Sequence, residues 1–189
     1  MTAELFQVAL EENIALHRRV KDSGAERVVE AASTIVEALR GGGKLMVFGN
    51  GGSAADAQHI AAELVGRFQR ERPALAAMAL TTDTSVLTSI ANDYAFDRVF
   101  ARQIEALGRS GDVALGISTS GDSPNVVAAL EAARALSMRT IALTGRDGGS
   151  VGRAAAIHVN VPGQDTARVQ EVHRTLLHVI CDLVERAFE

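Results

Sequence analysis

The sequence predicts an α/β domain in which a five-stranded, mainly parallel sheet is doubly wound and flanked by helices. From Lys44 onward, short apolar runs of strand length alternate with segments of helical periodicity. Such an order is typical of parallel sheets whose connections are helices. Turns rich in glycine follow the first, third and fourth of these strands, and each leads into a helical segment. Because no linker, internal repeat or low-complexity segment interrupts the pattern, residues 1–189 are expected to form a single domain.

The elements follow in order along the chain. Apolar residues at helical spacing predict helices at 3–21 and 26–40, and Gly41–Gly43 provide a stop for the second. Strands are expected at 44–48, 75–80, 112–117, 139–144 and 156–161. Helices are expected at 54–68, 84–91, 97–107, 123–136, 149–154 and 166–187. A doubly wound domain does not need the first two helices, so residues 1–42 are expected to be an extension that packs on another chain or covers one sheet edge.

Composition excludes several classes of protein. The net charge of −4 argues against a broad nucleic-acid surface, and no window approaches the ~18 consecutive apolar residues of a membrane span. The start of the chain is acidic and lacks the apolar centre of a signal peptide, so a cytoplasmic protein is expected. The single cysteine, Cys181, lies in an apolar helical stretch, which favours a core residue over a reactive thiol.

The first glycine turn, at residues 49–53, joins a strand to a helix. Such a turn directs free backbone N–H groups toward one point and favours an anion, above all a phosphate. The spacing matches neither the Walker A loop nor Gly-x-Gly-x-x-Gly, so an ordinary tight turn remains the alternative. Downstream, His59 and Glu63 are four residues apart and share one helix face.

A second turn, at residues 116–125, strengthens the first. It supplies the hydroxyls of Ser118, Thr119, Ser120 and Ser123, and Ser123 before Pro124 is a natural N-cap. Hydroxyls and helical N–H groups together form a phosphate site without a lysine, although an ordinary Ser/Thr-rich loop is the alternative. Two such turns at strand carboxyl ends favour a sugar phosphate or a similar anion.

Polar residues on the last helix form another candidate group, which consists of Gln170, Glu171, His173 and His178. His59 and Glu63 are better spaced for one metal ion. Gln170 and His178 are ~12 Å apart along a straight helix, so whether both reach one ion stays open. Each histidine of the last helix is either a hydrogen-bonded interface residue or a ligand. Asn92 and Asp93 either cap a helix or reach the ligand, and Arg67 either lies near an anion or is solvated.

Taken together, these motifs resemble the sugar isomerase (SIS) family and, within it, the bacterial phosphoheptose isomerases, over nearly the whole chain. The resemblance is carried by Gly49–Ser53, Asp56–Leu64, Ile90–Asp93, Gly116–Ser123, Leu143–Gly149, Val169–His173 and His178. It implies that the protein is a homotetramer with active sites between subunits and with one zinc ion per subunit. It also implies the conversion of sedoheptulose 7-phosphate to D-glycero-D-manno-heptose 7-phosphate.

The resemblance also assigns roles to residues. Phosphate binding falls to Ser53, Ser118, Thr119, Ser120 and Ser123. The sugar site is lined by Asn50, Gly51, Gly52, Asn92 and Asp93, with Gln170 beside the substrate. Zinc ligation falls to His59, Glu63, Gln170 and His178, and acid–base catalysis to Glu63 and His178.

The reaction moves a proton between adjacent carbons through an enediol, and our hypothesis is that Glu63 is the base while His178 serves the oxygens. The main alternative is a non-catalytic relative that senses a sugar phosphate or binds the replication initiator DnaA. This chain keeps Glu63 and His178, which favours the enzyme. A third interpretation is an isomerase of the same fold that acts on a different phosphosugar.

Overall fold

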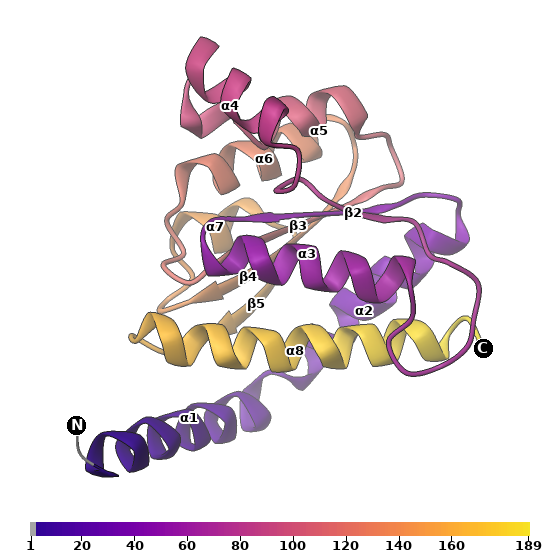
Figure 1. Ribbon diagram of the computed structural model, residues 1–189. Coiled ribbons are helices and arrows are strands. Elements are labelled where there is room, and N and C mark those ends of the chain that lie inside the picture. The colour runs from indigo at the N-terminus through magenta and orange to yellow at the C-terminus, as the bar shows by residue number, and fades with distance from the viewer. Residues whose placement is uncertain (1–2) are drawn as a thin grey trace.

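The computed structural model describes residues 3–189, and within them a five-stranded sheet has helices on both faces (Figure 1). The strands are β1 (Leu45–Gly49), β2 (Ala77–Ala79), β3 (Val113–Ser118), β4 (Arg139–Gly145) and β5 (Ile157–Val161). Their order is β2-β1-β3-β4-β5, and every neighbouring pair is parallel. The predicted doubly wound fold is confirmed, with a wholly parallel sheet.

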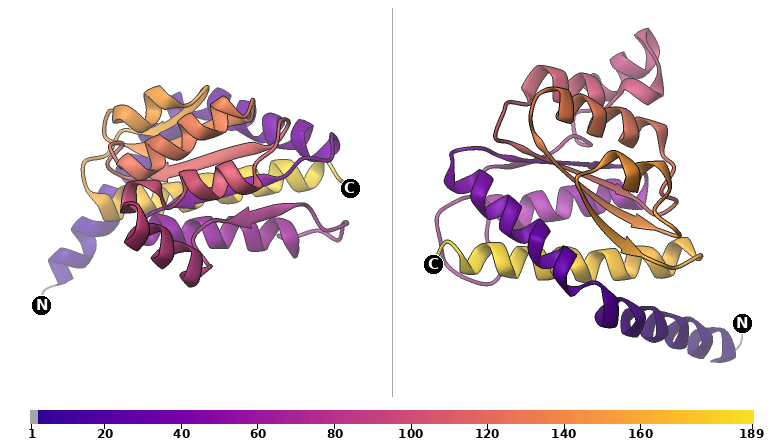
Figure 2. Two further views of the ribbon diagram at one scale, coloured as in Figure 1. Left: turned by 90° about the horizontal axis from the view of Figure 1, so that it is seen from above. Right: turned by 180° about the vertical axis from the view of Figure 1, so that it is seen from behind.

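The helices divide into two layers. One layer contains α2 (Ala25–Arg40), α3 (Gly52–Val65) and α8 (Thr166–Arg186), with α1 (Ala3–Ser23) attached to it. The other contains α4 (Thr84–Asp93), the 3₁₀ helix η1 (Phe96–Arg98), α5 (Ala101–Leu107), α6 (Pro124–Ala135) and α7 (Gly149–Ala154). Figure 2 shows the sheet between these layers.

The sheet separates two apolar cores because successive side chains on a strand point to opposite faces. In β1, Leu45 and Val47 belong to the core beneath α2, α3 and α8, whereas Met46 and Phe48 belong to the core beneath α5 and α6. All five residues of β1 are buried. A strand that is covered on both faces reads as a continuous apolar run, which is why β1 was predictable.

The two N-terminal helices have different environments. Ile35 on α2 is fully buried in the main core, so α2 is part of the layer that covers the sheet. Helix α1 projects from the body of the molecule, and Leu5 and Phe6 on it are 67% and 68% exposed (Figure 2). Residues 1 and 2 of the predicted extension lie outside the described part of the chain.

Several predicted elements have different boundaries in the structure. The strand expected at 75–80 is paired only at Ala77–Ala79, because β2 is an edge strand with β1 as its one neighbour. The helix expected at 54–68 ends at Val65, and an irregular segment that α8 holds in place follows it. The helix expected at 97–107 is divided into η1 and α5, and Val99 and Phe100 between them are buried.

Among residues 3–189, each helix is too short or too polar to cross a bilayer.

Candidate functional site

Helices α3 and α8 lie side by side and run in the same direction (Figure 1). Contacts between them follow in register: Asp56 meets Arg174, and about one turn further along His59 meets His178. Side chains far apart in the sequence are therefore aligned along one seam.

Three side chains on this seam converge. Nε2 of His59 lies 2.8 Å from Oε1 of Glu63 and 3.4 Å from Nε2 of His178. One ligand atom from each residue lies within 4.8 Å of the others, and all three residues are half-buried. Nitrogens that are each ~2.05 Å from one tetrahedral zinc ion are separated by about 3.3 Å, so the two imidazoles fit such an ion. The carboxylate and the imidazoles of this cluster can also donate and accept protons.

Gln170 lies at the other end of the seam, against the start of α3. A Cβ atom added to Gly52 would be 1.9 Å from Nε2 of Gln170, so a larger residue at position 52 would force this amide to move. Gln170 and His178 both line one hollow of about 390 Å³ beside α8. Gln170 is therefore next to the first glycine turn, while the other three predicted metal ligands form the cluster further along.

An ion pair between a buried carboxylate and an exposed arginine, which local sequence patterns did not predict, lies between these two ends. Oδ1 of Asp56, a fully buried residue, accepts hydrogen bonds from Nε and Nη2 of Arg174 at 3.2 and 2.9 Å.

His173 on α8 bonds the backbone, since its Nε2 donates to the carbonyl of Thr144 at 3.0 Å. Burial lowers the pKa of His173 to about 4 against smaller opposing effects of that bond and of Asp56, so His173 is neutral near pH 7. This is the hydrogen-bonded alternative rather than a ligand.

The serine-rich turn brings three hydroxyls together at the end of β3. Oγ of Ser118 lies 2.9 Å from Oγ of Ser123 and 3.3 Å from Oγ of Ser120. Ser123 is the N-cap residue of α6, but its side chain makes no capping bond. The predicted N-cap position is therefore confirmed, but the Ser123 hydroxyl bonds Ser118 and does not cap the helix. Thr119 lies in the same turn and is half-buried.

Two further contacts join the turns. The side-chain amides of Asn50 and Asn125 bond each other reciprocally at 2.8 Å, which links the first glycine turn to the start of α6. Helix α7 supports the second turn, because the Val151 N–H donates to the carbonyl of Gly121. Ser53 is buried, and Gly51 has a φ of +56°, which glycine adopts without strain. Asn125 was not predicted as a site residue, and its position after Pro124 in the second turn was the one indication in the sequence that it lies near the site.

Three residues with predicted or alternative site roles are exposed. Asn92 and Asp93 form the last turn of α4 rather than a link between helices, and α4 packs against the core on the opposite sheet face. Both are exposed, and Asn92 donates to Asp93. Arg67 is exposed and lies 3.9 Å from Glu71, which agrees with the solvated alternative.

The prediction that Cys181 is a core residue is confirmed. It is 1% exposed, and burial raises the pKa of its thiol to about 12. A thiol with so high a pKa carries almost no thiolate at neutral pH, which excludes a nucleophilic role.

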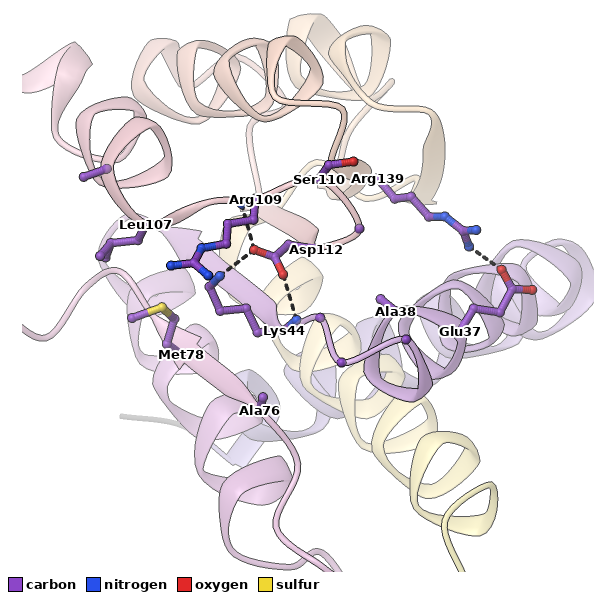
Figure 3. Close-up of a pocket in the computed structure, with 15 residues that line it drawn as sticks. Glu37, Ala38, Lys44, Ala76, Met78, Leu107, Arg109, Ser110, Asp112 and Arg139 are labelled. Atoms are coloured by element: carbon purple, nitrogen blue, oxygen red, sulfur yellow. Dashed lines mark hydrogen bonds and ion pairs between the residues drawn. The ribbon is translucent and has the colours of Figure 1, made fainter.

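Another hollow lies at the opposite end of the sheet (Figure 3). It has a volume of about 650 Å³ and is lined by residues at the amino ends of β1, β3 and β4, among them Lys44, Asp112 and Arg139. Asp112 accepts bonds from the Lys44 ammonium and the Arg109 N–H, and Arg139 pairs with Glu37 (Figure 3). None of the predicted site residues lines this hollow. Ligands of α/β sheets bind at strand carboxyl ends, which favours the turns after β1 and β3, where the α3–α8 seam begins, over this hollow.

Comparison with known proteins gives one family. A model described as "SIS domain" matches residues 10–145. The chain is 60% identical to a phosphoheptose isomerase from Geobacter sp. (strain M21) over 159 residues, which are 84% of this chain and 83% of the relative. It is 55% identical to a phosphoheptose isomerase from Roseiflexus sp. (strain RS-1) over 94% of this chain and 90% of that protein.

Solved structures agree with the sequence comparison. A phosphoheptose isomerase from Neisseria gonorrhoeae superposes with a TM-score of 0.93 at 47% identity, covering 97% of this chain and 98% of its own. One from Francisella tularensis gives a TM-score of 0.94 at 37% identity, covering 98% and 100%. The similarity therefore extends over the whole fold, including both helices of the seam.

Proposed function

The chain belongs to the SIS domain family, among its phosphoheptose isomerases, and we propose that Glu63 and His178 carry out its proton transfers. The enzyme converts sedoheptulose 7-phosphate to D-glycero-D-manno-heptose 7-phosphate, an aldose–ketose isomerisation through an enediol. The observation that carries the assignment is the meeting of Glu63 and His178 on the adjacent helices α3 and α8, of which α3 begins at the first of two turns suited to a phosphate.

The reaction requires a base that removes a proton from one carbon and returns it to the next. Glu63 takes this role, because a carboxylate has two oxygens with which to reach adjacent carbons. His178 moves protons at the sugar oxygens, for which an imidazole is suited near neutral pH. Support comes from the cluster, in which both side chains are half-buried and face one small volume.

The substrate's phosphate is held by the hydroxyls of Ser53, Ser118, Thr119, Ser120 and Ser123. The contacts among Ser118, Ser120 and Ser123 support this assignment, since three hydroxyls turned toward one another can donate together to phosphate oxygens. Asn50, Gly51, Gly52 and Gln170 line the sugar. Asn92 and Asp93 are exposed on the opposite layer, so we propose that they complete the site of a neighbouring protomer.

A zinc ion, one per subunit, is proposed to bind His59, Glu63 and His178, with Gln170 as a predicted fourth ligand. The donor set of two imidazoles and a carboxylate is one that zinc accepts, and the spacing of the two nitrogens supports the fit. When bound, the ion would polarise the carbonyl and stabilise negative charge on the enediolate. His59 has no other assigned role and acts by holding the ion near Glu63.

A homotetramer with sites between subunits is part of the same proposal. The exposed apolar residues of α1, including Leu5, Phe6 and Ile14, favour burial against other protomers. A largely apolar groove of about 400 Å³ between α1, α2 and α8 continues this surface. A cytoplasmic location remains a prediction.

The enzyme is distinguished from a sensor or a DnaA-binding module by turnover. A coupled assay with sedoheptulose 7-phosphate should give heptose 7-phosphate with the wild type and none with Glu63→Gln, while both proteins remain folded. Parallel assays with shorter phosphosugars test for a different substrate. Substrate binding without turnover by the wild type, under metal-replete conditions, would contradict the proposal. The comparisons do not favour the non-catalytic alternative, because the curated relatives reported above are phosphoheptose isomerases.

A further inference from the structure

We propose that Phe68 is a positioning residue, whose ring fixes the imidazole of His178 toward His59 and Glu63, and that the buried carboxylate of Glu185 holds Phe68 in place. This inference rests on the proposed roles of the His59–Glu63–His178 cluster. It adds a residue from outside the cluster and a device that holds the two sides of the site together.

The ring contact is specific in its geometry. The rings of Phe68 and His178 are stacked, with centroids 5.3 Å apart and an interplanar angle of 23°. His178 also meets the His59 ring edge-on, with centroids 5.0 Å apart and an interplanar angle of 74°. The imidazole therefore contacts two rings, and rotation of the His178 side chain away from the cluster would remove both contacts.

Phe68 lies on the irregular segment that follows α3, so its position requires an anchor. Glu185 on α8 supplies one: its Oε1 accepts from the N–H of Phe68, and its Oε2 accepts from the N–H groups of Gln69 and Arg70, each at 2.9 Å. Glu185 is fully buried. Burial raises the pKa of its carboxyl, but the three N–H groups and Arg72 outweigh that effect and lower it, so the group is ionised at neutral pH.

The same anchor reaches Glu63. The Arg72 side chain is fully buried, and its Nε lies 3.5 Å from Oε1 of Glu185. Its Nη2 donates to the carbonyl of Glu63 at 2.7 Å, and its Nη1 donates to the carbonyl of Leu64 at 2.8 Å. These carbonyls end α3 and lack partners within the helix. One buried ion pair thus joins the backbone of Glu63 to the segment that carries Phe68.

The ring and the anchor can be tested separately. Glu185 bonds the backbone of Phe68, so Phe68→Ala removes the stacking and leaves the anchor's acceptors intact. Phe68→Tyr retains the ring. Gln69→Ala is the matched control, because Gln69 bonds Glu185 through its own N–H while its side chain is exposed.

The experiment measures kcat and KM for sedoheptulose 7-phosphate and the affinity for Co²⁺ by competition with a chelator. Residues that orient metal ligands typically change affinity or activity by about 10- to 100-fold when removed. Phe68→Ala is expected to lower kcat and weaken Co²⁺ binding by at least about tenfold on that scale, with KM within about twofold of the wild type. Phe68→Tyr should restore both values, and Gln69→Ala should match the wild type.

Two comparisons complete the design. Glu185→Gln alone and combined with Phe68→Ala should give non-additive losses of kcat, because both act on His178 through one ring. If Phe68→Ala does not fold, as judged by its melting transition, Phe68→Leu replaces it. Normal kcat and Co²⁺ affinity in the folded ring-deficient variant, alongside an inactive His178→Gln, would overturn the inference alone. A fully active His178→Gln would instead overturn the proposed function.

Discussion

Nε2 of His59 on α3 lies 3.4 Å from Nε2 of His178 on α8, although the two residues are 119 positions apart in the sequence. This separation matches two ligands of one tetrahedral zinc ion. It depends on the parallel alignment of two helices that are anchored at one end by Arg174 and Asp56 and at the other by Glu185. The proposed chemistry therefore depends on the relative position of α3 and α8.

Zinc should stabilise the fold through this pair of residues. At a free ion concentration 100 times Kd, binding contributes about 2.7 kcal/mol, which raises the Tm of a domain of this size by roughly 5–10 °C. His59→Ala and His178→Ala should abolish this rise in a thermal melt, whereas His17→Gln, a histidine outside the cluster, should keep it. A full shift in the His59 variant would exclude it as a ligand.

Ser123→Ala should weaken substrate binding with little cost to stability. The hydroxyl makes no capping bond, so α6 loses no side-chain cap. A hydrogen bond to a charged phosphate contributes about 1.5–3 kcal/mol, so KM should rise roughly 10- to 100-fold. Steady-state kinetics and a thermal melt measure the two effects, with Ser85→Ala as an exposed control. Unchanged KM would remove Ser123 from the phosphate site.

Stability should fall with acid because of His173. Its pKa is lowered from 6.5 to about 4 in the folded protein, so the unfolded chain binds more protons between these values. The contribution is fully present above pH 6.5 and is lost as the pH falls toward 4, by about 3 kcal/mol in total. Urea unfolding between pH 4.5 and 8 should show this loss in the wild type. His173→Gln should lack that portion of the pH dependence. A variant whose stability depends on pH as the wild type's does would contradict the attribution to His173.

Assembly should depend on the exposed face of α1. Replacing Leu5 and Phe6 with glutamate places charges on side chains that are 67% and 68% exposed in the protomer, so the monomer should remain folded. If α1 packs on other protomers, sedimentation of the variant should detect species smaller than the tetramer expected for the wild type. Activity should fall with it, because the sites are proposed to lie between subunits. An intact, active tetramer would exclude this face from the interface.

Local sequence patterns predicted the elements that are defined by local physics. The buried run of β1 and the alternation after Lys44 follow from strand burial, and the shared face of His59 and Glu63 follows from helical periodicity. The edge strand β2 was overestimated, because its length depends on pairing with β1 alone.

Long-range contacts were the part that could not be predicted. Gln170 and His178 share a helix, but only the register against α3 places one at Gly52 and the other at His59. Glu185 resembles any charged residue near a helix end, and nothing in its surroundings along the chain indicates three N–H donors from residues 68–70. Asp56 and Arg174 are likewise partners only in the folded chain.

The assignment of Glu63 as the base is tested most directly by proton exchange. Sedoheptulose 7-phosphate is incubated in D₂O with wild type, Glu63→Gln or His178→Gln, and deuterium at the reacting carbons is followed by NMR. The wild type should incorporate deuterium and Glu63→Gln should lose incorporation by about 10²- to 10⁴-fold, the usual contribution of a general base. His178→Gln should be slowed as well. Deuterium incorporation at the wild-type rate by a Glu63→Gln variant that is folded and binds substrate would contradict the mechanism.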